Sequence, residues 1–163
     1  MRLRVPLAIA IPMALLLAGI IILILQSPQI GYARRTRSEW EAARTLWSAR
    51  GSASYQAIVH SNAPTEPTEG TNRIWVARGM VRRAVNEDCP SCPHELFASL
   101  TIEALFERIA TECLDALPDQ LCSVAYDDDL GFPRRIDTYP RGRDGQEPLS
   151  ITVEEVVLLG PEP

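Results

Sequence analysis

The chain has 163 residues with 21 acidic and 16 basic side chains, so its formal net charge is −5. The two signs are separated along the chain, because residues 1–86 carry eleven arginines against four acids and residues 87–163 carry five against seventeen. An acidic C-terminal half argues against a nucleic-acid partner, since contacts to phosphate groups need a cationic surface.

The N-terminal segment Val5–Leu25 contains no charged or strongly polar residue. A helix of this length spans about 31 Å, which matches the hydrocarbon core of a bilayer. We therefore predict a membrane anchor at residues 1–26, with the lipid bilayer as the partner of residues 5–25. A cleaved signal peptide is the alternative, because Gly31–Ala33 is a small-x-small pattern. The segment is longer than a usual signal h-region of roughly 7 to 15 residues, which favours an uncleaved anchor.

The compartment is indicated by the four cysteines, Cys89, Cys92, Cys113 and Cys122. Four cysteines in a domain of this size are typical of two disulfides formed in an oxidising compartment. Arginines on both sides of the apolar segment nearly cancel the positive-inside rule, so the cysteines decide the orientation. We predict a single-pass protein of the cell membrane whose domain lies on the extracytoplasmic side. The expected bridges are Cys89–Cys92 and Cys113–Cys122, although four cysteines allow three pairings.

A stalk is predicted at residues 27–37, which show no hydrophobic periodicity. The residues that follow, from Ser38 to Glu41, have the pattern of a capping box and predict the start of a helix. This helix is expected at Glu39–Arg50. Gly51 is then placed to end this helix at the C′ position.

The rest of the chain shows two groups of predicted strands separated by a second helix. Strands are expected at residues 54–60, 73–77 and 81–85, the helix at residues 101–117, and further strands at residues 121–126, 134–139 and 150–158. Arg78-Gly79 is the predicted turn of the first hairpin, with positive φ at Gly79, and Thr101 is the predicted N-cap. This order predicts an α+β domain at residues 38–163, with a small antiparallel sheet of about five to six strands packed against two helices.

Several short motifs occur in a distinctive order along this domain. Trp47, Gly51 and Tyr55 form the pattern W-x3-G-x3-Y, TIEALFERI follows at residues 101–109, and VAYDDDLGFPRRID follows at residues 124–137. In this order the motifs resemble a bacterial family known only as the domain of unknown function numbered sixty-one seventy-four. The resemblance implies a small exported α+β module and implies no activity. It marks a set of structural residues: Trp47, Gly51, Tyr55, Gly79, Phe106, Tyr126, Gly131, Phe132 and Pro133.

The spacing of Cys89 and Cys92 raises an alternative function, because a C-x-x-C pair is the pattern of a thiol-disulfide redox centre. The βαβ context of that centre is absent, which favours structural disulfides. A zinc ion held by all four cysteines is a further alternative. Only one cysteine pair has the spacing of a zinc knuckle, so the metal-binding hypothesis is the weaker one.

The acidic run Asp127–Asp129 does not follow the alternating pattern of an EF-hand. It favours a turn in which Asp side chains accept backbone N–H groups, Gly131 has positive φ and Phe132 returns to the core. The two histidines, His60 and His94, lie in no nucleophile or metalloprotease motif. We therefore predict no cofactor and no metal site, and the sequence identifies no catalytic residue. The function is interpreted as that of a non-catalytic binding or structural module of the bacterial envelope, with another envelope protein as its expected partner.

Overall fold

The computed structural model describes residues 28–62, 68–115, 120–140 and 148–160. The chain divides into two compact units, Met1–Ser38 and Glu39–Pro163, and the sheet belongs to the second. No helix among the described residues has the length and apolar character of a membrane span. The predicted anchor Val5–Leu25 lies outside the described residues.

The first described helix, α2, covers Pro28–Arg50. The predicted helix start at Glu39 was therefore wrong, because residues 28–37 of the predicted stalk are also helical. Proline is favoured in the first turn of a helix, where its missing N–H is not needed. No further proline follows before Arg50, and a single interior glycine, Gly31, costs only about 1 kcal/mol. The capping-box pattern consequently lies inside the helix.

Three strands follow α2: β1 at Tyr55–Ser61, β2 at Gly70–Ala77 and β3 at Met80–Asn86. Arg78 and Gly79 form the turn of the β2–β3 hairpin with φ values of 55° and 73°. Positive φ at both central residues matches the right-handed twist of the flanking strands. The predicted turn and the positive φ at Gly79 are thus confirmed.

A run of three helical segments links the two groups of strands. These are the 3-10 helix η1 at His94–Leu100, the α-helix α3 at Ile102–Arg108 and the π-helical segment η2 at Ile109–Asp115. The Thr101 side chain accepts a hydrogen bond from the Ala104 N–H, which confirms the predicted N-cap. The apolar residues at helical spacing in the predicted helix are buried at five positions, Ile102, Leu105, Phe106, Ile109 and Cys113. Leu114 is half-buried, and Leu117 lies outside the described residues.

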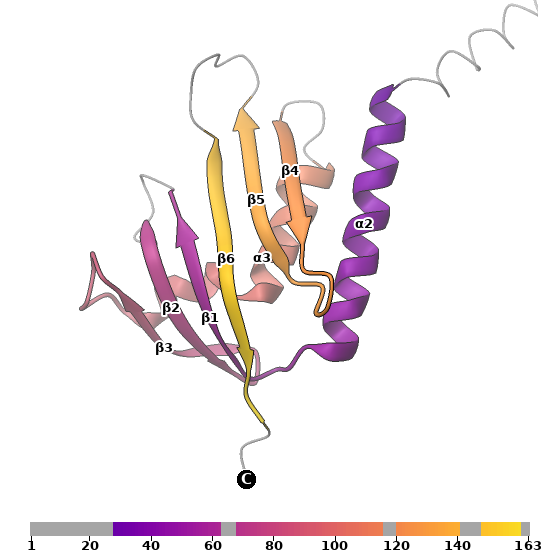
Figure 1. Cartoon of the computed structure of the whole chain (residues 1–163). Helices are drawn as coiled ribbons and strands as arrows, with labels where there is room; N and C mark the ends of the chain where they lie inside the picture. Colours follow the sequence, from indigo (N-terminus) through magenta and orange to yellow (C-terminus); the bar gives the residue numbers. More distant parts are fainter. Residues whose placement is uncertain (1–27, 63–67, 116–119, 141–147, 161–163) are drawn as a thin grey trace, which may run out of the picture. The chain divides into compact units, whose positions relative to one another are not determined.

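The last three strands are β4 at Gln120–Tyr126, β5 at Pro133–Pro140 and β6 at Leu149–Leu158. All pairs are antiparallel, and the order across the sheet is β3-β2-β1-β6-β5-β4 (Figure 1). The first and last strands, β1 and β6, therefore lie side by side at the centre. They join two three-stranded meanders into one sheet, which confirms the α+β class.

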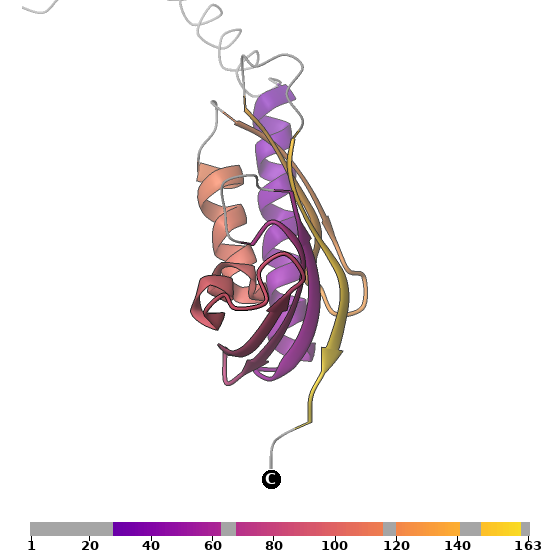
Figure 2. The ribbon, with the colours of Figure 1, turned by 90° about the vertical axis from the view of Figure 1, so that its left-hand side faces the viewer.

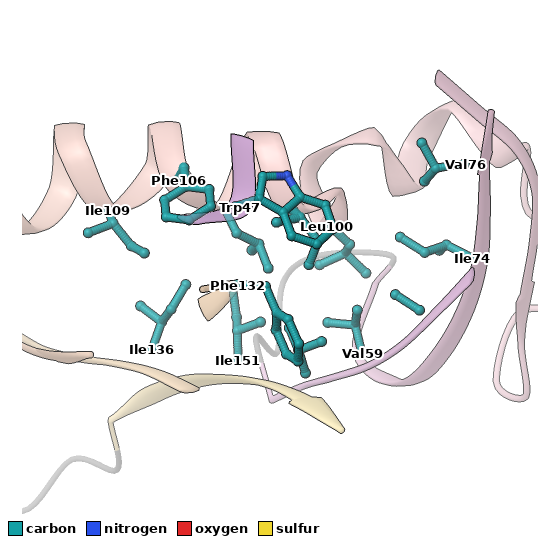
Figure 3. Packing of buried hydrophobic residues seen from close by; sticks show 14 of the residues in the cluster. Trp47, Val59, Ile74, Val76, Leu100, Phe106, Ile109, Phe132, Ile136 and Ile151 are labelled. Carbon is teal, nitrogen blue, oxygen red and sulfur yellow. The ribbon is translucent and has the colours of Figure 1, made fainter. Parts of the chain in front are cut away.

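The sheet has two unlike faces, because successive side chains of a strand point to opposite sides. Within the second unit one face, here called the covered face, packs against the helices, and no described helix of that unit lies over the other, the open face (Figure 2). The core lies between the covered face and the helices (Figure 3). Strand β1 illustrates the alternation: Tyr55, Ala57 and Val59 are at most 1% exposed, whereas the residues between them are half-buried.

Candidate functional site

The W-x3-G-x3-Y motif builds one aromatic cluster in the core. Its Trp47 ring lies edge-on to Tyr55 at 5.4 Å and to Phe132 at 6.4 Å between ring centroids. Trp47 comes from α2, Tyr55 from β1 and Phe132 from the turn before β5, so the cluster joins three separate elements. Edge-to-face pairs of this kind contribute about 0.5–1.5 kcal/mol each beyond the area they bury.

A carboxylate from α3 completes this cluster. Glu103 accepts hydrogen bonds from the Trp47 indole N–H at 3.2 Å and from the Tyr55 hydroxyl at 2.8 Å, one on each oxygen. The Tyr55 oxygen in turn accepts the Ile102 N–H at 2.8 Å. Burial, and then the charge of Glu103, raise the pKa of Tyr55. The hydroxyl therefore keeps its proton at neutral pH and serves as a donor, not as a base.

The space beside Glu103 is a shallow hollow of about 520 Å³ between α2 and α3. An ion pair between Arg44 and Glu107, 2.9 Å long, crosses its rim, and both side chains are largely exposed. Each oxygen of Glu103 accepts one hydrogen bond, from Trp47 and from Tyr55. The charged groups of this hollow are thus paired with protein groups, which fits a structural role.

The glycines of the motifs permit close contacts with α2. A Cβ on Gly51 would lie 2.5 Å from the Trp47 carbonyl oxygen and 2.6 Å from its indole ring. Helix α2 ends at Arg50, directly before Gly51, as predicted, and because the φ of Gly51 is not positive, the absence of a side chain is what matters there. Gly131 has both features: its φ is +81°, and a Cβ there would meet the Ala43 carbonyl oxygen.

The acidic run forms the predicted turn. Its Asp127 carboxylate accepts the N–H groups of Asp129 at 3.0 Å and of Leu130 at 2.8 Å. The Asp127 carbonyl accepts the Gly131 N–H, and the Asp127 N–H donates to the Phe132 carbonyl, both at 2.9 Å. Phe132 is 6% exposed. The turn therefore uses Asp127 to satisfy backbone groups, as the sequence indicated.

The remaining motif residues also serve the packing. Phe106 stacks on Tyr126 at 6.3 Å and lies edge-on to Trp40 at 6.5 Å. Burial, and then the charge of Glu39, raise the pKa of Tyr126. Pro133 is buried at the start of β5, whereas Gly79 has open space around it.

The cysteines form two disulfides, Cys89–Cys92 and Cys113–Cys122, as expected. The first pair follows edge strand β3, and the second links η2 to the opposite edge strand, β4. A zinc site made of all four cysteines is therefore not formed. Cys89 lies in a loop, where its N–H and that of Asp88 donate to the Asn86 side chain. It does not begin a helix, so the geometry that lowers a thiol pKa in redox enzymes is lacking.

Metal-binding side chains do not gather elsewhere in the part of the chain that the structure describes: no group of three or more His, Cys, Asp or Glu residues is placed to hold an ion. His60 contacts Thr71 on the neighbouring strand, and His94 lies 3.4 Å from Glu95. The two histidines thus belong to different local pairs.

The open face carries the residues that the sequence analysis did not single out. Across β3, β2 and β1 one row of paired positions reads Val85, Arg73 and Ile58, and the next reads Arg83, Trp75 and Gln56. The signal was present in the alternation of β2, where Arg73 and Trp75 occupy the positions between buried residues. Because Trp75 points away from the core, its contacts come from side chains on the open face, such as Arg83.

At the other end of the sheet the open face carries a second apolar pair. Leu121 of β4 lies opposite Tyr139 of β5, and they are 46% and 42% exposed. The nearby Arg135 bonds Asp137 at 2.8 Å, and this hydrogen bond raises the pKa of Arg135. Val85 and Val157 are each 42% exposed as well. Apolar side chains therefore remain accessible on strands at both edges and in the centre.

Comparison with known proteins gives one family. Residues 39–157 match the family of unknown function DUF6174. No curated protein and no solved structure matches the chain. The matched residues cover the whole motif series from Trp47 to Pro133 and nearly all of the sheet. The chain therefore belongs to the DUF6174 family.

Proposed function

We propose that this protein is a membrane-tethered, extracytoplasmic binding module without catalytic activity, and that the open face of its sheet binds another protein of the bacterial envelope. The observation that carries this proposal is the contrast between the two faces. The family motifs are used to build the covered face and its helices. The open face keeps large apolar side chains in solvent.

The tether is supported by the sequence of Val5–Leu25, whose apolar length fits a bilayer. The extracytoplasmic location is supported by the two disulfides, because such bonds persist in oxidising compartments. Both supports concern where the module works. With this tether and location, the open face would bind a partner on the extracytoplasmic side of the membrane.

A binding role for the open face is supported by its composition. A solvated face of an antiparallel sheet is usually polar, with alternation between apolar and polar residues along each strand. Here Val85, Leu121, Tyr139 and Val157 are each more than two fifths exposed, and Trp75 lies among them half-buried. Contiguous exposed apolar patches mark interaction surfaces, and strand pairing places Trp75 and Val157 in one cross-strand row of the open face, on either side of Gln56.

Site-specific photo-crosslinking tests the proposal. A photoreactive phenylalanine derivative replaces Trp75 on the open face, and Leu96 of η1, which is 44% exposed, is the matched control. We expect a discrete crosslinked protein from position 75 in intact cells and none from position 96. Equal labelling at the two positions, or none at either, would contradict a binding role for the open face.

The tether is tested separately by extracting membranes with alkaline carbonate. The full chain should remain in the membrane pellet, and a chain that starts at Gln26 should not. Release of the full chain into the supernatant would remove the anchor from the proposal without affecting the open face.

A further inference from the structure

Strands β2 and β3 place an unusual group of side chains on the open face, here called the arginine patch: Arg73, Trp75, Arg82, Arg83 and Val85. The pairing places Arg83 opposite Trp75 and Val85 opposite Arg73, so these four form a compact square. The Arg83 guanidinium lies over the Trp75 ring at 4.7 Å from its centroid. Arg82 is the extra residue of a bulge next to this pair.

From this patch we infer the chemistry of the partner, and the inference rests on the proposed binding role of the open face. The partner is an acidic polypeptide surface that presents aspartate or glutamate side chains beside an apolar one. Its carboxylates would meet Arg73 and Arg82, and its apolar side chain would cover Val85 and the edge of Trp75.

The arginine patch is complementary in charge to an acidic partner. Arg73, Arg82 and Arg83 are all exposed, and within the described residues none of the three forms an ion pair. By contrast, Arg44, Arg108 and Arg135 are paired with acids of the domain. Arginine presents five donors in a planar fork that fits a carboxylate, and it is enriched at the hot spots of interfaces.

Protection of the sheet edge does not explain the whole patch. Charges and bulges on an edge strand discourage pairing with another chain, and this accounts for Arg82 and Arg83 on β3. It does not account for Arg73, because β2 is an interior strand. It does not account for Val85 either, which exposes an apolar side chain on that same edge.

The test uses the full-length chain in neutral detergent, titrated with a labelled random copolymer of glutamate and tyrosine. We expect binding that weakens as salt is added, because exposed charges are screened. Arg73→Gln should weaken binding at least about fivefold, whereas the matched charge change Arg134→Gln on β5 should weaken it less than about twofold. Val85→Ser should weaken binding as well, since charge alone is not the whole contact.

Three results would overturn the inference: equal weakening by Arg73→Gln and Arg134→Gln, tighter Arg73-dependent binding to phosphatidylglycerol vesicles than to the copolymer, or self-association that Arg73→Gln abolishes. These results would indicate bulk charge, a lipid or a second copy of the chain. In intact cells, a crosslink from position 75 that is unaffected by Arg73→Gln would also reject the acidic partner. That last result would leave the binding role of the open face standing.

Discussion

The Tyr55 hydroxyl donates a 2.8 Å hydrogen bond to the Glu103 carboxylate, across 48 positions of sequence. The same oxygen accepts the Ile102 N–H, so one phenol joins the central strand β1 to the start of α3. Because Tyr55 has no exposed surface, its polar atom must be satisfied inside the protein. The bond explains why a tyrosine, and not a phenylalanine, ends the W-x3-G-x3-Y motif.

Tyr55→Phe should lower the free energy of unfolding by about 1–3 kcal/mol, because the buried Ile102 N–H loses its acceptor. Tyr126→Phe is the matched control. The Tyr126 hydroxyl is buried and has no hydrogen-bond partner among the described residues, so its removal breaks no hydrogen bond and should leave the free energy of unfolding unchanged or raise it. Urea denaturation of both variants measures the difference. A loss in Tyr55→Phe no larger than that in Tyr126→Phe would show that the hydrogen bonds of the Tyr55 hydroxyl do not stabilise the fold.

Stability should also fall at alkaline pH. Folding raises the pKa of both Tyr55 and Tyr126 above the ordinary value of 10, chiefly through burial. The unfolded chain therefore binds fewer protons than the folded one above about pH 10, so the contribution is complete below that pH and is lost as pH rises further. Urea midpoints between about pH 8 and about pH 11 should show this fall. The fall should be smaller in Tyr55→Phe, and an unchanged slope in that variant would contradict the assignment.

Three glycine-to-alanine variants separate backbone strain from lack of space. At Gly79 the φ is positive, but an added Cβ would have no atom within 4 Å. Gly79→Ala should therefore lower the free energy of unfolding by about 1 kcal/mol. At Gly51 the φ is not positive, but an added Cβ would clash with the Trp47 ring. At Gly131 a positive φ and a steric clash occur together. Thermal melts should rank Gly131→Ala as the most damaging, at about 3 kcal/mol or more. If Gly79→Ala were the worst of the three, the close packing of the motif against α2 would be refuted.

The two disulfides should differ in their response to reductant. Cys113 and Cys122 are 6% and 7% exposed, whereas Cys89 and Cys92 are half-buried. Mild reduction followed by alkylation should therefore modify Cys89 and Cys92 first. Replacing Cys113 and Cys122 by serine should cost about 2–3 kcal/mol, and the shorter Cys89–Cys92 loop should cost less. Peptide mapping that found Cys113 alkylated first would contradict the burial of that bond.

Much of the fold could be predicted because its signals are local. Turn residues placed the Arg78-Gly79 hairpin and the Asp127 turn, and helical spacing placed the core face of α3. Cys113 and Cys122 are only nine residues apart, so the pairing that closes short loops could be predicted from the sequence. The start of α2 could not be placed, because a capping box is a weak signal when the preceding residues also favour helix.

The long-range relationships could not be predicted from one sequence. Pairing of β1 with β6 joins positions such as Tyr55 and Leu158 that no periodicity connects. The role of Glu103 depends on two donors from other elements, so its place on an exposed helix position gave no sign of it. The arginine patch was equally hidden, because Arg73 and Val85 become neighbours only through strand pairing.

The most direct test of the account is hydroxyl-radical footprinting of the full chain in native membranes compared with the purified chain. We expect Trp75 and Tyr139 of the open face to be protected in membranes relative to the purified chain. Leu96, exposed on η1, should react equally in both. The contradicting result is unchanged reactivity of Trp75 and Tyr139 together with protection of Leu96. It would show that the protein binds its partner through the helices and not through the open face.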